Sequence, residues 1–300
     1  MTINEWLISS SKSLEKKSIS SARLDCLIIL EHVLKTDRVK ILAQLDSELT
    51  INQNFVLRKY LQNRKKLIPI AYLTNNVEFY GRDFYVDKRV LIPRPESELI
   101  VEITKYLIAN LQNKTLIDKT SNLPKIEYIY IKKYLDQHLK DSLIKVADIG
   151  TGSGNLGISI TLESPSTMVD LIDISKKALQ VAQINVDKYS TNNFIIQNNL
   201  LKNITPNYDI IVANLPYVPD DFPVSKSTKH EPKKAIFSGN DGLSHYKALF
   251  KQLNTADKKP LYIIIEKLPI LNTKLNDIAS NSNYKSFFTS DYVNVYQLIL

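Results

Sequence analysis

The sequence is poor in cysteine and histidine. Its one cysteine, Cys26, excludes an intramolecular disulfide and fits a reducing compartment. This cysteine and the four histidines stand at no metal-ligand spacing, so we expect no bound metal. The chain also lacks any run of about eighteen apolar residues, and its start lacks the basic-then-apolar pattern of a signal peptide. We therefore expect a cytoplasmic protein that does not associate with membranes.

Glycine and proline are also scarce, with 7 and 12 of the 300 residues, which leaves little room for flexible linkers. Hydrophobic residues make up 44% of the chain and charged residues 23%, so we expect a chain folded almost throughout, in two domains given its length. The net charge is +8, but the lysines are spread from Lys12 to Lys285. A basic solvated surface explains this charge as well as a nucleic-acid partner does.

The first part of the chain has the periodicity of helices. Leucines at 24, 27, 30 and 34 recur at three- and four-residue steps and predict one apolar face. Thr50 and Gln53 predict a capping box at the start of another helix, which must end before Pro69. We assign residues 1–75 to a small helical domain.

A change of pattern follows. Residues 77–92 are rich in aromatic and β-branched side chains around Gly81, which predicts a β-hairpin, and we assign 76–95 to a hairpin linker. A helix is expected from Ser97 to about Leu111. Apolar strand candidates then alternate with helical patterns at 144–149, 168–172, 194–196, 209–213 and 261–265, with closing strands at 284–288 and 293–300. This alternation over 96–300 predicts an α/β fold with a doubly wound, mostly parallel, Rossmann-like sheet.

The most informative string is Val146 to Gly157, an apolar strand that runs into a glycine loop and opens a helix. Glycines at 150, 152 and 154 permit positive φ and close approach of a ligand, and the helix start presents free N–H groups. A dinucleotide fingerprint requires glycine at the sixth position, which here is Asn155, so NAD fits poorly. The alternative is a structural turn whose glycines serve packing alone.

Two carboxylates flank this loop. Asp148 would repel a pyrophosphate and suits a ligand that carries an ammonium group. Asp173, at the end of the second strand candidate, can accept hydrogen bonds from both hydroxyls of a ribose. A ligand with an amine and a ribose but no required phosphate is S-adenosylmethionine, which we expect to be the cofactor.

The fourth strand candidate ends in Asn214, Leu215, Pro216 and Tyr217, which resembles the NPPY signature of methyltransferases that act on planar exocyclic or amide nitrogens. An amide nitrogen is a poor nucleophile, so the site must orient it. An Asn oxygen and a backbone carbonyl can accept both of its N–H bonds, and Tyr217 would pack against the planar group. Read alone, the tetrapeptide is equally compatible with a plain turn.

Further strings accompany these motifs: LIPRPESE at 91–98, HEP at 230–232 and GNDGL at 239–243. Together they resemble the family of release factor glutamine methyltransferases, known as HemK or PrmC. The resemblance covers nearly the whole chain, including SARLD at 21–25 and PIAY at 69–72.

The resemblance implies transfer of a methyl group to the side-chain amide nitrogen, N5, of the glutamine in the Gly-Gly-Gln loop of peptide chain release factors. It implies that the 1–75 domain helps to bind the release factor, that 96–300 is the methyltransferase domain, and that one strand near its end is antiparallel. We expect a monomer without direct nucleic-acid contact. The expected substrate-holding residues are Asn214, Leu215, Pro216 and Tyr217. The expected cofactor-binding residues are Asp148, Gly150, Thr151, Gly152, Ser153, Gly154, Asp173, Asn199, Leu200 and Asn214.

The chain departs from the family at several places. Leu215 stands where the family has proline, which retains the carbonyl but reduces preorganisation. Asn199 and Leu200 replace an aspartate beside an adenine-stacking aromatic, so weaker cofactor binding is expected. Glu266 lacks the glycine that follows it in the family, and residues 112–143 look inserted. Neither of these last two features receives a functional interpretation.

Several alternatives stay open. Arg94 and Glu98 could form a loop-to-helix ion pair or contact substrate, and Glu231 could close over the acceptor site or be merely solvated. A second reading is a nucleic-acid methyltransferase that acts on adenine N6, since it would have to orient an exocyclic amine in the same way. Residues 1–68, however, lack the basic sequence with interspersed aromatic residues that is typical of a nucleic-acid recognition domain. A non-catalytic adaptor that binds S-adenosylmethionine is the third reading.

Overall fold

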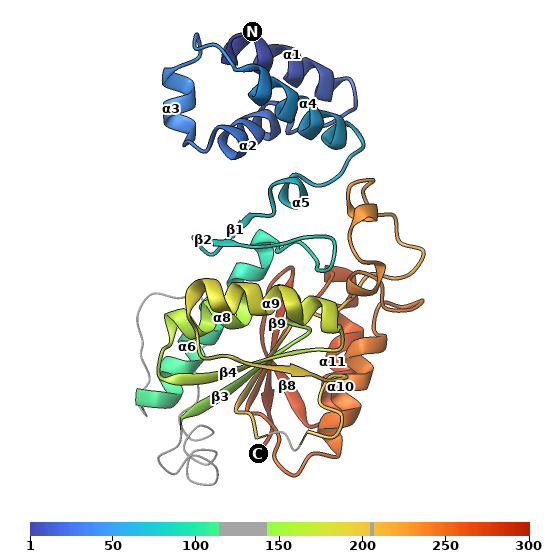
Figure 1. Cartoon of the computed structure of the whole chain (residues 1–300). Coiled ribbons are helices and arrows are strands. Elements are labelled where there is room, and N and C mark those ends of the chain that lie inside the picture. The colour runs from blue at the N-terminus through green and yellow to red at the C-terminus, as the bar shows by residue number, and fades with distance from the viewer. Residues whose placement is uncertain (114–142, 205–206) are drawn as a thin grey trace. The chain divides into compact units, whose positions relative to one another are not determined.

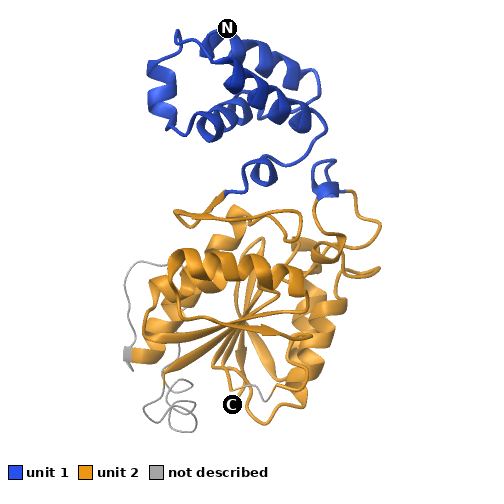
Figure 2. Ribbon diagram, viewed as in Figure 1, with its two compact units in different colours: residues 1–76, 224–230 blue, residues 77–223, 231–300 orange. Residues whose placement is uncertain are grey.

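The structure, a computed structural model, describes residues 1–113, 143–204 and 207–300. The chain forms two compact units (Figure 2). Unit 1 contains residues 1–76 and 224–230, and unit 2 contains residues 77–223 and 231–300. The boundaries proposed at residues 75 and 95 stay a prediction. Most of the stretch that looks inserted, residues 112–143, lies outside the described residues.

Unit 1 is helical, with helices α1 (Ile3–Glu15), α2 (Ala22–Leu34), α3 (Arg38–Ala43), α4 (Ile51–Lys65) and α5 (Ile70–Thr74). The predicted capping box of α4 is confirmed, because the Gln53 N–H donates to Thr50 Oγ1 and the Thr50 N–H donates to Gln53 Oε1. The helix ends four residues before Pro69. None of the helices in the described ranges is long and apolar enough to cross a membrane.

The predicted apolar face of α2 is partly wrong. Leu27 and Leu30 are buried, but Leu24 is 46% exposed. The buried face instead includes Asp25, whose carboxylate accepts a hydrogen bond from Arg64 of α4 at 2.7 Å. The buried face of α2 therefore includes a charged residue, Asp25, whose charge is paired with Arg64, and the leucine spacing did not predict this.

Unit 2 begins with an antiparallel hairpin, β1 (Val77–Phe79) and β2 (Arg82–Phe84), which confirms the predicted one. Helix α6 (Glu98–Asn113) follows. The central sheet then contains β3 (Ile144–Ile149), β4 (Thr167–Asp173), β5 (Phe194–Gln197), β6 (Ile210–Ala213), β7 (Tyr262–Glu266), β8 (Tyr284–Thr289) and β9 (Val293–Leu298). Every predicted strand of the sheet overlaps one of these seven.

The strands lie in the order β5-β4-β3-β6-β7-β9-β8 (Figure 1). Strands β3 to β7 pair in parallel, and β9 is antiparallel to both β7 and β8. This confirms the doubly wound, mostly parallel Rossmann-like sheet with one antiparallel strand near its end. The strand order reverses direction between β3 and β6, so the carboxyl ends of these two strands open a crevice suited to a ligand.

Helices cover both faces of this sheet. α6 packs with α8 (Asn155–Glu163), which also packs with α9 (Lys176–Tyr189), while α10 (Ser244–Asn254) and α11 (Asn272–Ser280) pack together on the other face (Figure 1). Strands β3, β6 and β7 are almost wholly buried, as expected for parallel strands covered on both sides. The predicted cap of α9 is confirmed, since the Ala178 N–H donates to Ser175 Oγ.

Candidate active site

The glycine loop connects β3 to α8. Gly150, Gly152 and Gly154 have φ values of +75°, +57° and +82°, in the left-handed region that favours glycine. The N–H groups of Gly150 and Thr151 donate to the Ile172 carbonyl of β4 at 2.8 and 3.0 Å. The loop is therefore held against the end of the neighbouring strand, and α8 begins immediately after it.

Asp148 lies beneath this loop. Its Oδ2 accepts hydrogen bonds from Thr151 Oγ1 at 2.6 Å and from the Gly157 N–H at 2.9 Å. Its Oδ1 has no partner among the described residues. Burial raises the pKa of this carboxyl to about 6. The hydrogen bonds to Asp148 thus stabilise the loop, and its second oxygen can still accept a further hydrogen bond.

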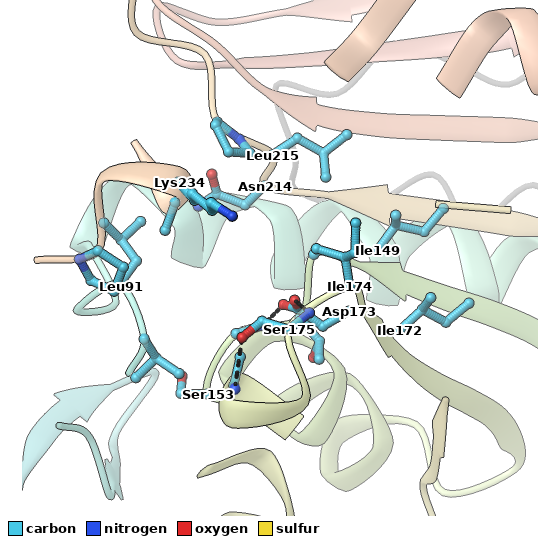
Figure 3. A pocket seen from close by; sticks show the side chains of 18 of the residues that line it. Leu91, Ile149, Ser153, Ile172, Asp173, Ile174, Ser175, Asn214, Leu215 and Lys234 are labelled. Atoms are coloured by element: carbon cyan, nitrogen blue, oxygen red, sulfur yellow. Dashed lines mark hydrogen bonds between the residues drawn. The ribbon is translucent and has the colours of Figure 1, made fainter. Parts of the chain in front are cut away.

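Asp173 ends β4 beside the loop, as the sequence predicts. Its Oδ2 accepts from the Gly152 N–H at 3.0 Å and its Oδ1 from the Ser175 N–H at 2.8 Å. Burial raises its pKa above the usual range of an aspartate. Figure 3 shows Asp173 between the loop and the start of α9, where the carboxylate faces the same cavity as Ser153.

A cavity of about 490 Å³ lies over the loop, within the size range of small-molecule sites. It brings together most residues predicted from sequence, namely Gly150, Thr151, Gly152, Ser153, Asp173, Asn199, Leu200, Asn214, Leu215 and Pro216. The described residues that line the cavity do not include Asp148, Gly154 or Tyr217. It does include residues that the sequence analysis missed, among them the 88–91 segment, Lys233, Lys234 and His245.

The end of β5 gives the cavity an apolar wall. Leu200 is 8% exposed and adopts φ +54°, a left-handed conformation uncommon for leucine. The Asn198 side-chain amide donates to the Leu200 carbonyl at 3.0 Å and stabilises this turn. Asn199 is exposed at the cavity, so its side chain is available to a ligand.

The segment from Asn214 to Tyr217, which we call the acceptor loop, leaves β6 next to the glycine loop. Ala213 is the register partner of Ile149, so Asn214 and Gly150 follow neighbouring positions of paired strands. Leu215 is 3% exposed, and a Cβ on Gly150 would lie 2.8 Å from its Cδ2. The side chain of Leu215 therefore packs directly against the first glycine, and a side chain at position 150 would displace it and would also be strained by the positive φ.

A buried carboxylate lies behind the acceptor loop. Glu266, at the end of β7, is 2% exposed and accepts hydrogen bonds from Asn214 Nδ2 at 2.9 Å, from Tyr217 OH at 2.7 Å and from Ser97 Oγ. Burial raises the pKa of Glu266, and burial with this adjacent carboxylate also raises that of Tyr217. The sequence analysis missed this role, although a glutamate that ends an apolar strand beside β6 was a signal for it.

Glu231 connects two of the strings that carried the family resemblance. Its side chain is buried and accepts from the Ile92 N–H at 3.0 Å and from Arg94 Nη2 at 2.5 Å. The reading of Glu231 as a merely solvated carboxylate is therefore wrong. Arg94 forms its ion pair with Glu231, whereas Glu98 accepts from the Tyr80 N–H. The loop from 91 to 94 is fixed to the residues that follow the acceptor loop.

The sequence is similar to known proteins and families. Residues 5–74 match the family described as PrmC N-terminal domain, and residues 132–231 match the methyltransferase small domain. The release factor glutamine methyltransferase of Bacillus anthracis is 31% identical over 78% of this chain and 76% of its own length. That of Coxiella burnetii is 33% identical over 77% and 73%. A bifunctional methyltransferase of Rickettsia felis is 32% identical over 88% of this chain and 51% of its length.

Proposed function

Because the chain belongs to the release factor glutamine methyltransferase family, we propose that it methylates N5 of the glutamine in the Gly-Gly-Gln loop of peptide chain release factors. The observation that carries this proposal is the meeting of two loops in one cavity. The glycine loop after β3 and the acceptor loop after β6 leave paired strands, and both line the cavity of about 490 Å³. A methyl donor and a planar acceptor would thus be held next to each other.

S-adenosylmethionine supplies a methyl group bound to a positively charged sulfur, ready for attack by a nucleophile. The cavity residues fit this cofactor. Asp173 lines the cavity where a carboxylate can accept from ribose hydroxyls. Asp148 lies beneath the glycine loop, outside this lining, and its Oδ1, which has no partner among the described residues, suits an ammonium group. Asn199 and Leu200 would contact the adenine. The left-handed glycines at 150–154 would let the cofactor approach the backbone closely.

The amide of the substrate is a weak nucleophile, and the acceptor loop can orient it for reaction. Asn214 Oδ1 and a backbone carbonyl of the loop would accept the two N–H bonds of the glutamine amide and hold its nitrogen in line with the methyl group. The nitrogen lone pair forms the new bond to carbon as the carbon–sulfur bond breaks. A proton then leaves the nitrogen to solvent, which restores a neutral amide. No metal and no covalent enzyme intermediate are needed.

The partner assignments belong to the same proposal. The match of residues 5–74 to the PrmC N-terminal domain favours a protein acceptor over nucleic acid. We propose that unit 1 helps to bind the release factor, and that the protein acts as a monomer without direct nucleic-acid contact. A cytoplasmic location fits the one cysteine, Cys26, which is buried and free.

The test is a transfer assay with purified protein, methyl-labelled S-adenosylmethionine and unmodified release factor. Asn214→Ala should lower turnover about 100-fold, because one acceptor for the substrate N–H is lost, while the cofactor Kd stays nearly unchanged. Asn193→Ala is the matched control, since Asn193 also donates two hydrogen bonds, to Thr161 and Val169, away from the cavity lining. Equal turnover in wild type and Asn214→Ala would remove the acceptor-loop assignment.

Cofactor binding is tested separately by calorimetry. Asp173→Asn should raise the Kd for S-adenosylmethionine about tenfold, because one acceptor oxygen for the ribose is lost and the loop bond to Gly152 weakens. Asp170→Asn on the same strand, where the carboxylate accepts from Tyr208 OH, is the control and should leave the Kd unchanged. An unaltered Kd in Asp173→Asn would contradict the ribose contact.

A further inference from the structure

Four side chains from separate parts of unit 2 meet behind the acceptor loop. Ser97 precedes α6, Asn214 and Tyr217 follow β6, and Glu266 ends β7. Asn214 Nδ2 lies 3.1 Å from Ser97 Oγ and 2.9 Å from Glu266 Oε2, and Ser97 Oγ donates to the same carboxylate oxygen. Ser97 is 1% exposed and Glu266 is 2% exposed. This buried cluster touches the described cavity through Ser97 and Asn214.

The hydrogen bonds determine which way the Asn214 amide points. A primary amide has two N–H donors and one acceptor oxygen. The nitrogen of Asn214 is directed inward, where one N–H is shared between the Ser97 hydroxyl and the Glu266 carboxylate. Ser97 can accept this N–H because its own hydrogen goes to Glu266. The amide oxygen makes no hydrogen bond in the described parts of the chain and is left for a ligand.

The opposite orientation is strongly disfavoured. Rotation of the Asn214 amide by half a turn would place its oxygen against the Glu266 carboxylate, with repulsion in place of attraction, and the Ser97 oxygen would lose the donor that Asn214 supplies. Tyr217 OH holds the other carboxylate oxygen at 2.7 Å, so Glu266 cannot turn away. The backbone is fixed as well, since Tyr246 OH donates to the carbonyls of Glu266 and Ala213 at the ends of β7 and β6.

We propose that Glu266 is a positioning residue for methyl transfer, which acts through Asn214 by turning its amide oxygen toward the acceptor nitrogen. This inference rests on the proposed function. The acceptor nitrogen carries two hydrogens, so it needs acceptors, and a reversed Asn214 would present a donor to a donor. Glu266 is separated from the cavity by Asn214 and Ser97 and is not itself a catalytic residue.

The hydrogen bonds of this cluster are more important for the acceptor loop because Leu215 stands where the family has proline. A proline would fix the backbone φ of the acceptor loop, and leucine does not. The side-chain bonds from Asn214 and Tyr217 to Glu266 restrain the residues on both sides of Leu215. They compensate for rigidity that the loop loses at that position.

The first experiment compares Glu266→Leu and Glu266→Gln with wild type in the transfer assay. Leucine removes the acceptor, so kcat should fall about 10- to 100-fold with an unchanged cofactor Kd. Glutamine keeps one oxygen for Asn214 and should restore part of the loss. Lys267→Met is the matched control: Lys267 is the next buried polar residue, but its ammonium group donates to the carbonyls of Ser290 and Asp291. It should lower stability without lowering kcat.

A double-mutant cycle separates positioning from general damage. In the Asn214→Ala background, Glu266→Leu should have almost no further effect on kcat, because the residue through which it acts is gone. Full turnover in Glu266→Leu, or an equal fold-loss with and without Asn214, would overturn the proposal.

A second readout does not depend on the acceptor protein. One side-chain N–H of Asn214 is shared between two buried acceptors, so in ¹⁵N spectra it should exchange slowly with solvent in wild type and rapidly in Glu266→Leu. The signal is assigned by its absence in Asn214→Ala. Rapid exchange in wild type would refute the orientation. Slow exchange that Glu266→Leu abolishes, in a protein that does not methylate release factor, would uphold the orientation and reject the proposed function.

Discussion

The buried carboxyl of Asp148 predicts a specific dependence of stability on pH. Asp148 is 1% exposed, one of its oxygens has no partner among the described residues, and burial raises its pKa from 3.8 to about 6. A carboxyl with a higher pKa in the folded chain binds a proton more readily when folded. Its protonation therefore stabilises the fold fully below the unfolded pKa, and this stability is lost as pH rises through about 6.

The magnitude follows from the two pKa values. Between pH 5 and pH 7.5, Asp148 should reduce the free energy of unfolding by about 1.4 kcal/mol, out of about 3 kcal/mol over the whole titration. Asp148→Asn cannot ionise, so the difference between variant and wild type isolates this contribution from all other titrating groups. Wild type should lose stability relative to Asp148→Asn as the pH rises.

The assay is urea denaturation of the cofactor-free protein at several pH values, followed by circular dichroism. The stability difference between Asp148→Asn and wild type should grow by about 1.4 kcal/mol from pH 5 to pH 7.5. Saturating S-adenosylmethionine should flatten this trend in wild type, because a nearby ammonium group favours the ionised carboxyl. A constant difference across the pH range would refute the reasoning about Asp148.

Substitutions at three other sites test separate parts of the structure. Asp25→Ala leaves the buried guanidinium of Arg64 unpaired and should destabilise unit 1 by about 3 kcal/mol, measured by fluorescence of the one tryptophan during urea denaturation. Asn185→Leu removes three hydrogen bonds that tie the glycine loop to the segment after the hairpin, and calorimetry should show about tenfold weaker cofactor binding. Gly150→Ala should weaken cofactor binding through its positive φ and its contact with Leu215, and Leu215→Ala in the same chain should relieve only the contact.

Much of the fold of unit 2 could be predicted because the sequence patterns that indicate its strands, helix starts and loops are local. Apolar runs marked the strands, Ser175 marked the start of α9, and three alternating glycines marked the loop that the structure places at the carboxyl end of β3. Parallel pairing then follows from the alternation of strands and helices. The gathering of Asp173 and Asn214 at one cavity follows in turn, since the carboxyl ends of parallel strands share an edge.

The interactions that local patterns missed join distant parts of the chain. Glu266 lies 52 residues from Asn214 in sequence, and Ser97 lies 117 residues from it. The periodicity of a sequence does not predict which buried carboxylate contacts which loop, because such a contact depends on tertiary packing. The burial of Asp25 in place of Leu24 has the same origin, since its partner Arg64 is 39 residues away.

The most direct test of the central claim is to locate the methyl group by peptide mass spectrometry after incubation with release factor and methyl-labelled S-adenosylmethionine. We expect one added methyl on the side-chain nitrogen of the Gly-Gly-Gln glutamine, absent when that glutamine is replaced by alanine and strongly reduced with Asn214→Ala. Absence of the label from this glutamine, despite cofactor binding measured on the same preparation, would contradict this expectation.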